Sequence, residues 1–105
     1  MRPFSFEETG LKGAYFVNCF NSSDPRGSFT KTFERSVFED AGIKFDMFES
    51  FVSTSSKNVV RGLHFQTRNP QSKYVCVVSG KAWDVIVDLR KDSDTYKKWA
   101  AFELS

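Results

Sequence analysis

Short apolar runs, each bounded by polar or turn-forming residues, make up most of this chain. Runs of roughly four to eight residues with this punctuation are typical of β-strands. The pattern therefore predicts seven short strands, over residues 14–20, 28–33, 46–54, 59–66, 73–79, 82–89 and 98–104. Residues 21–27 are dense in turn formers. Seven short strands predict an all-β fold, which is a sandwich, a barrel or a jelly roll.

One segment carries the signals of a helix instead. Ser36 and Glu39 have the three-residue spacing of a capping box at a helix N-terminus. Gly42 follows at a position suited to ending the helix. The sequence therefore predicts one short helix, over residues 37–41, in an otherwise β-structured chain.

Length and composition predict one globular domain over residues 1–105. Of the 105 residues, 40% are hydrophobic and 27% are charged. The net charge of +2 is too balanced to indicate a nucleic-acid partner. The N-terminus lacks the apolar core of a signal peptide, and no run approaches the ~20 apolar residues of a membrane span. We therefore expect a cytoplasmic protein without a membrane partner, in which Cys19 and Cys76 are buried free thiols.

Two predicted hairpins bring titratable residues together. If the turn after residue 66 closes symmetrically, Gln66 lies opposite Lys73 and His64 lies opposite Val75, so His64, Gln66 and Lys73 share one sheet face. A second hairpin, at the next turn, places Asp84 opposite Val75 on the same face. The only histidine of the chain is therefore predicted to neighbour a lysine and a carboxylate.

An imidazole in this setting is suited to act as a base. A neighbouring ammonium group and desolvation disfavour the imidazolium, whereas a carboxylate such as Asp84 orients the ring. The favoured chemistry is removal of a proton from carbon beside a carbonyl, with His64 as the base and Lys73 stabilising the charge on the carbonyl oxygen. From spacing alone, a structural or surface role of His64 stays open. No metal site is expected, because the chain has one His and position 66 is Gln.

Ordered motifs along the chain carry a resemblance to a known family. The motifs are DPRGSF at 24–29, RGLHFQ at 61–66, QSK at 71–73, Gly80, DVIVDLRKDS at 84–93 and TY at 95–96. In this order they resemble the dTDP-4-dehydrorhamnose 3,5-epimerases. The resemblance covers essentially the whole chain and corresponds to the N-terminal part of the longer family protein.

The resemblance implies a metal-free cupin, a β jelly roll that forms a homodimer, needs no cofactor and acts on a 4-keto-6-deoxy nucleotide sugar. The family's base at C3 and C5 is the histidine of RGLH, which corresponds to His64. The lysine near the keto oxygen corresponds to Lys73. Arg61 and Arg26 correspond to pyrophosphate ligands, and a guanidinium group pairs well with phosphate oxygens. Without the resemblance, either arginine is interpreted as a surface charge.

Departures from the family pattern bear on the substrate. Lys31 stands where the family often has Glu, which inverts the charge near the expected nucleotide. Glu49 and Phe51 stand where many members carry two amides, so the base and the sugar are left open. Phe29 and Phe51 are each expected to stack on a nucleobase or to lie in the core. Gln66, on the predicted face with His64, completes the substrate-binding set.

The family's general acid, a tyrosine, and the aspartate that orients its histidine lie beyond Ser105. A jelly roll that stops here lacks strands over its inner face, which leaves open edges. We expect either a fragment of a longer gene product or a module completed by a partner or by dimerisation.

Three functions follow, in order of preference. The first is an epimerase of the dTDP-4-dehydrorhamnose type, in deoxysugar biosynthesis for surface polysaccharide. The second is a catalytically silent module that binds or scaffolds sugar nucleotides. The third, binding of single-stranded nucleic acid by a Phe-rich β surface, is disfavoured by the balanced charge.

Overall fold

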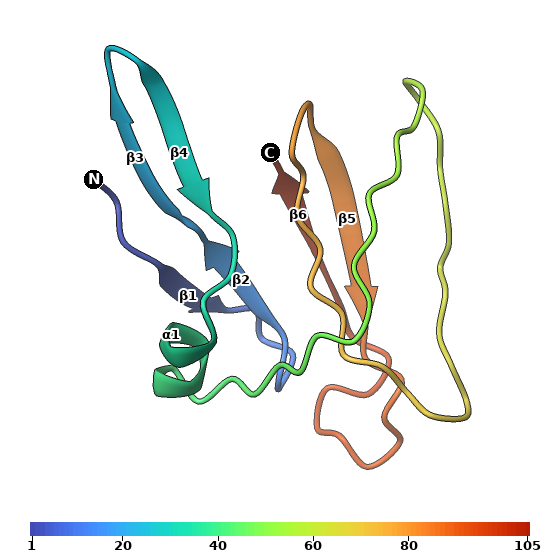
Figure 1. Cartoon of the computed structure of the whole chain (residues 1–105). Coiled ribbons are helices and arrows are strands. Elements are labelled where there is room, and N and C mark those ends of the chain that lie inside the picture. Colours follow the sequence, from blue (N-terminus) through green and yellow to red (C-terminus); the bar gives the residue numbers. More distant parts are fainter.

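The computed structural model describes all residues 1–105 and consists of six strands and one helix (Figure 1). The strands pair in three antiparallel hairpins, β1 with β2, β3 with β4 and β5 with β6. The elements are β1 (Ser5–Glu8), β2 (Tyr15–Asn18), β3 (Phe20–Asp24), β4 (Gly27–Lys31), α1 (Arg35–Asp40), β5 (Ala82–Val87) and β6 (Trp99–Leu104). The predicted all-β class with one short helix is confirmed.

The first hairpin begins with a strand that the apolar pattern did not predict. β1 pairs with β2 in a register that sets Phe6 opposite Val17. The turn between them is held by Thr9, whose hydroxyl donates to the carbonyl of Ala14 at 2.9 Å. β1 escaped prediction because its four residues include only one apolar side chain, too few to show alternation.

The second hairpin occupies the segment predicted as a long turn. β3 and β4 pair up to Asp24 and Gly27, so the reversal is confined to Pro25 and Arg26. Asp24 Oδ1 accepts a hydrogen bond from the backbone N–H of Arg26 at 2.9 Å, a contact typical of Asx turns. Gly27 has φ +136°, a conformation that favours glycine. The prediction of a turn over all of residues 21–27 is therefore wrong, because its polar residues also form strand.

Helix α1 confirms the predicted stop signal and corrects the predicted start. Its N-cap is Glu34, without a side-chain capping bond. Because the helix begins at Arg35, Ser36 already lies in the first turn, so the capping box with Glu39 is absent. At the other end Gly42 has φ +80°, and its N–H donates to the carbonyl of Glu39 at 2.9 Å.

An aromatic cluster around the helix forms the core of the N-terminal half. Phe38 is 3% exposed. Its ring centroid lies 4.7 Å from Phe33, 5.0 Å from Phe6, 5.4 Å from Tyr74 and 5.9 Å from Phe4, all edge-on. Aromatic rings prefer such arrangements to face-to-face contact. The cluster thus joins β1, α1 and one residue from the second half of the chain.

The third hairpin confirms the predicted strands at 82–89 and 98–104. β5 pairs along its whole length with β6. The ring of Phe102 on β6 lies 5.5 Å from that of Phe16 on β2. This contact brings the last hairpin against the first.

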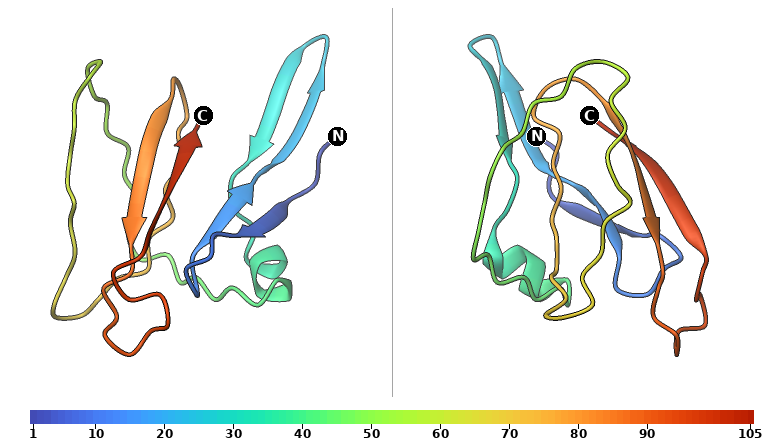
Figure 2. Two further views of the ribbon diagram at one scale, coloured as in Figure 1. Left: turned by 180° about the vertical axis from the view of Figure 1, so that it is seen from behind. Right: turned by 90° about the vertical axis from the view of Figure 1, so that its right-hand side faces the viewer.

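The segment between α1 and β5 carries no paired strand. Residues 44–81 make no backbone-to-backbone hydrogen bond. In Figures 1 and 2 this stretch, green to yellow, runs as open chain beside the third hairpin. The strands predicted over 46–54, 59–66 and 73–79 are therefore wrong for this structure. A strand needs a neighbour for its amide and carbonyl groups, and here no segment pairs with them.

The open segment leaves much of the molecule accessible to solvent. The accessible surface is 9211 Å², whereas a folded chain of 12.0 kDa has about 6,000 Å². The radius of gyration is 15.3 Å, against about 13 Å for a closed domain of this length. Leu11, Phe38 and Asp88 are the only buried residues. Most apolar residues of the open segment thus face solvent; Phe45, Tyr74 and Val77 are half-buried.

Candidate functional site

His64 lies exposed in the open segment. Two residues earlier, Gly62 has φ +102°. A Cβ atom at Gly62 would lie 3.3 Å from Nδ1 of His64, tighter than ordinary packing. Position 62 therefore suits glycine both for its backbone and for the space it leaves to the imidazole.

The strand pairing predicted to align the base, the cation and the carboxylate does not form in the structure. Lys73 and Gln66 are exposed, and Asp84 is half-buried on β5 opposite Phe102. No hydrogen bond or ion pair joins His64, Lys73 and Asp84. The hairpins predicted to align them are wrong, because the stretches that carry His64 and Lys73 pair with no strand and β5 pairs with β6. Their chemical roles stay predictions.

The other predicted ligands of the open segment are not joined to one another by hydrogen bonds or ring contacts. Nε of Arg61 donates to the hydroxyl of Ser55 at 3.0 Å, a bond within the segment. Glu49 is exposed and Phe51 is 80% exposed. Neither contacts another predicted site residue through a hydrogen bond or a ring. Phe51 therefore does not lie in the core.

By contrast, the hairpin of β3 and β4 gathers three predicted substrate ligands. Phe29 and Lys31 lie two residues apart on β4 and share one face with Phe20 of the paired strand. The rings of Phe20 and Phe29 lie 6.3 Å apart, and Nζ of Lys31 lies 5.7 Å from the Phe20 ring. A shallow hollow of about 570 Å³ includes Phe20, Phe29 and Arg26 at the tip. An exposed ring beside cationic side chains suits a nucleotide.

Both cations of this face have acidic partners in the structure. Arg26 lies 2.6 Å from Asp24, and its side chain is 91% exposed. This hydrogen bond lowers the pKa of Asp24 and raises that of Arg26. Lys31 Nζ lies 3.5 Å from Glu34. Because both pairs are exposed, water screens them and a phosphate is able to compete for either cation.

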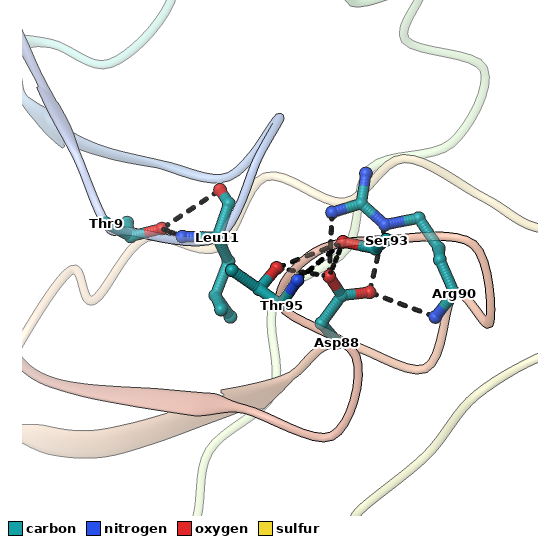
Figure 3. Close-up of polar contacts among 6 residues, drawn as sticks. All are labelled: Thr9, Leu11, Asp88, Arg90, Ser93 and Thr95. Atoms are coloured by element: carbon teal, nitrogen blue, oxygen red, sulfur yellow. Dashed lines mark hydrogen bonds and ion pairs between the residues drawn. The ribbon is translucent and has the colours of Figure 1, made fainter.

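A cluster of hydrogen bonds around Asp88, in the loop between β5 and β6, was not predicted from the sequence (Figure 3). The carboxylate of Asp88 accepts hydrogen bonds from Nε and Nη2 of Arg90 at 3.0 and 3.1 Å, and from the hydroxyls of Ser93 and Thr95 at 2.5 and 2.6 Å. Arg90 is the largest cause that lowers the pKa of Asp88, followed by the two hydroxyls. The sequence signal for this cluster is an aspartate followed by hydrogen-bond donors two, five and seven residues later. The Asp88 cluster fixes the conformation of the loop and lies outside the predicted site.

The two cysteines are free, as expected, but they are not buried. Cys19 is half-buried and Cys76 is exposed. Desolvation nevertheless raises the pKa of the Cys76 thiol. Cys76 is exposed because the segment that carries it pairs with no strand.

Two further properties concern metals and membranes. Nowhere in residues 1–105 do three or more His, Cys, Asp or Glu side chains gather as metal ligands do. Helix α1 has six residues, so the structure contains no membrane-spanning helix.

Solved structures define the class of protein to which this fold belongs. It superposes with a TM-score of 0.92 on dTDP-4-dehydrorhamnose 3,5-epimerase from Bacillus anthracis, at 35% identity over 98% of this chain and 60% of that one. The epimerase from Legionella pneumophila, solved with dTDP-4-keto-L-rhamnose, gives 0.91 at 32% identity over 98% of this chain and 55% of that one. The fold is therefore that of the cupin-type sugar-nucleotide epimerases, which confirms the predicted jelly-roll class.

Sequence comparison defines the family. A sequence model of the dTDP-4-dehydrorhamnose 3,5-epimerases matches residues 8–105. The relative from Methanothermobacter thermautotrophicus is 42% identical over the whole of this chain and 57% of its own length. The chain belongs to the dTDP-4-dehydrorhamnose 3,5-epimerase family and spans about half the length of the curated relatives it matches.

Proposed function

We propose that this chain carries the proton-abstracting residues of an epimerase for a dTDP-4-keto-6-deoxyhexose. The observation that carries the proposal is the Legionella pneumophila structure, which holds dTDP-4-keto-L-rhamnose and matches 98% of this chain. Family membership over residues 8–105 supports the same reaction class, an isomerisation.

The proposed reaction uses the acidity of carbon beside a ketone. His64 takes the proton from C3 or C5, and the electron pair of the broken C–H bond forms an enolate with the C4 carbonyl. The ammonium group of Lys73 stabilises the enolate oxygen, and Asp84 orients the imidazole. A proton from solvent then adds to the opposite face of the same carbon and His64 releases its proton to solvent, so the centre is inverted and the atom count is unchanged.

The proposed nucleotide site combines the β3–β4 face with the open segment. Arg26 and Arg61 would pair with the diphosphate, because guanidinium groups form two parallel hydrogen bonds to phosphate oxygens. Phe29 would stack on the base. The remaining ligands in the proposal are Lys31, Glu49, Phe51 and Gln66. Support comes from the observed grouping of Arg26, Phe29 and Lys31 at one hairpin.

We further propose that the protein works as a homodimer in the cytoplasm, without a cofactor, in deoxysugar synthesis for surface polysaccharide. Exposed apolar side chains support association, since Phe48 is 96% exposed, Val60 93% and Trp83 70%. Apolar surface of this extent marks an interaction site in a folded protein. Gel filtration tests the assembly, and a monomeric elution volume would contradict it.

The alternative is a sugar-nucleotide binding module without turnover. The lack of strand pairing in the stretches that carry His64 and Lys73 favours it, because the predicted alignment of the two side chains depends on that pairing. The hollow at the β3–β4 hairpin does not depend on those two residues.

Isotope exchange separates the two functions. The protein is incubated with a dTDP-4-keto-6-deoxyhexose in deuterated water, and deuterium at C3 and C5 is measured by NMR. The epimerase proposal predicts incorporation at one or both carbons. A binding titration that succeeds while neither carbon gains deuterium supports the binding module and refutes the epimerase.

A further inference from the structure

Tyr74 is the only residue between 47 and 80 whose hydrogen bonds reach the rest of the molecule. Its hydroxyl donates to the backbone carbonyl of Thr32 at 2.5 Å. The same hydroxyl lies 3.4 Å from Sγ of Cys19. The other side-chain hydrogen bond of this stretch joins Arg61 to Ser55 and is internal. One side chain therefore connects the stretch that carries His64 and Lys73 to the N-terminal half.

The ring of Tyr74 is fixed by packing as well. Its centroid lies 5.4 Å from Phe38, 6.1 Å from Phe45 and 6.4 Å from Phe33. Phe38 is the most buried residue of the molecule. The anchor of the open segment thus enters the aromatic core, where side chains have little freedom.

The Tyr74 hydroxyl is protonated at neutral pH. Burial, and then its hydrogen bond with Cys19, raise the pKa of Tyr74. At neutral pH the phenol therefore carries its proton and can donate it to the Thr32 carbonyl. Without that bond, the hydroxyl of Tyr74 would lose the partner that ties it to the segment after β4.

Lys73 precedes this anchor directly. In extended chain, successive side chains point to opposite sides. Tyr74 points into the aromatic core, and Lys73 is exposed. Fixing the backbone at residue 74 therefore limits where the ammonium group of Lys73 can lie.

We propose that Tyr74 is a positioning residue that holds Lys73 in place for the enolate. This inference rests on the proposed epimerase function. Lys73 acts mainly on the charge that develops in the transition state, so loss of its position lowers kcat and leaves KM nearly unchanged. A displacement of about 1 Å in such a group costs up to roughly 100-fold in rate.

The test compares Tyr74→Phe with the matched control Tyr15→Phe in the full-length protein. Phe at 74 keeps the ring in the core and removes only the hydroxyl, whereas Tyr15 is 40% exposed and its hydroxyl makes no hydrogen bond in the structure. We expect Tyr74→Phe to lower kcat for C3 and C5 exchange about tenfold with KM unchanged, and Tyr15→Phe to match wild type. Equal kcat in both variants overturns the inference.

A double-mutant cycle identifies the residue through which Tyr74 acts. In a Lys73→Ala background, followed over long incubations, Tyr74→Phe should cause no further loss. The same fold-loss in both backgrounds shows a general structural effect and overturns the inference. Limited proteolysis provides a readout without turnover: trypsin should cleave after Lys73 faster in Tyr74→Phe than in wild type, and equal cleavage rates contradict the anchor. If wild type incorporates no deuterium, the proposed function itself fails.

Discussion

Replacing Phe38 by Ala tests whether the aromatic cluster around α1 stabilises the fold. Phe38 is 3% exposed, and four aromatic rings lie within 4.7–5.9 Å of its centroid. Truncation of a buried Phe costs about 3–5 kcal/mol through lost burial and the cavity left behind. We expect about 4 kcal/mol, because four edge-on contacts are lost together. A domain of this length has a free energy of unfolding of about 5–15 kcal/mol, so the ratio of folded to unfolded molecules falls by about three orders of magnitude.

Urea denaturation followed by circular dichroism measures this loss. In a thermal scan the same change corresponds to a fall in Tm of roughly 20 °C. Phe65→Ala is the matched control, because Phe65 is 67% exposed and contacts no other ring; its expected effect is within about 0.5 kcal/mol. Equal losses in the two variants, or an unchanged midpoint for Phe38→Ala, would refute the assignment of the core.

Two further predictions concern the hydrogen-bond cluster around Asp88 and the glycine beside His64, Gly62. The donors around Asp88 lower its pKa in the folded state, so its stabilising effect is present above the unfolded value near 3.9 and is lost as the pH falls towards the folded value. Between about pH 5 and pH 2, wild-type Tm should drop more steeply than that of Asp88→Asn, and parallel curves would contradict this. Gly62→Ala should slow C3 and C5 exchange by displacing His64. The control Gly10→Ala, with similar backbone strain but open space for the methyl group, should not, and equal rates would count against the imidazole contact.

The sequence predicted those elements that pair with a near neighbour. The strands at β2, β4, β5 and β6 lie within their predicted ranges or shifted by one residue, because each belongs to a local hairpin. Gly42 marked the end of the helix, since a positive φ is needed there. The strands predicted over 46–79 depended on partners at longer range, and apolar alternation carries no information about whether such a partner exists.

The sequence predicted which residues form the site better than it predicted how they are arranged in space. The grouping of Arg26, Phe29 and Lys31 follows from a two-residue turn, which local sequence encodes well. The approach of His64 to Lys73 required strand pairing that the structure lacks. Tyr74 was read only as part of an apolar strand, because neither its spacing nor its neighbours reveal that its hydroxyl reaches Thr32.

The most direct test of the central claim is deuterium incorporation at C3 and C5 of a dTDP-4-keto-6-deoxyhexose by His64→Ala, with Gln71→Ala as the control beside it in the motif region. If His64 is the base, the His64→Ala protein binds the sugar nucleotide but incorporates no deuterium, while Gln71→Ala retains exchange. Incorporation by His64→Ala at the wild-type rate would contradict the claim.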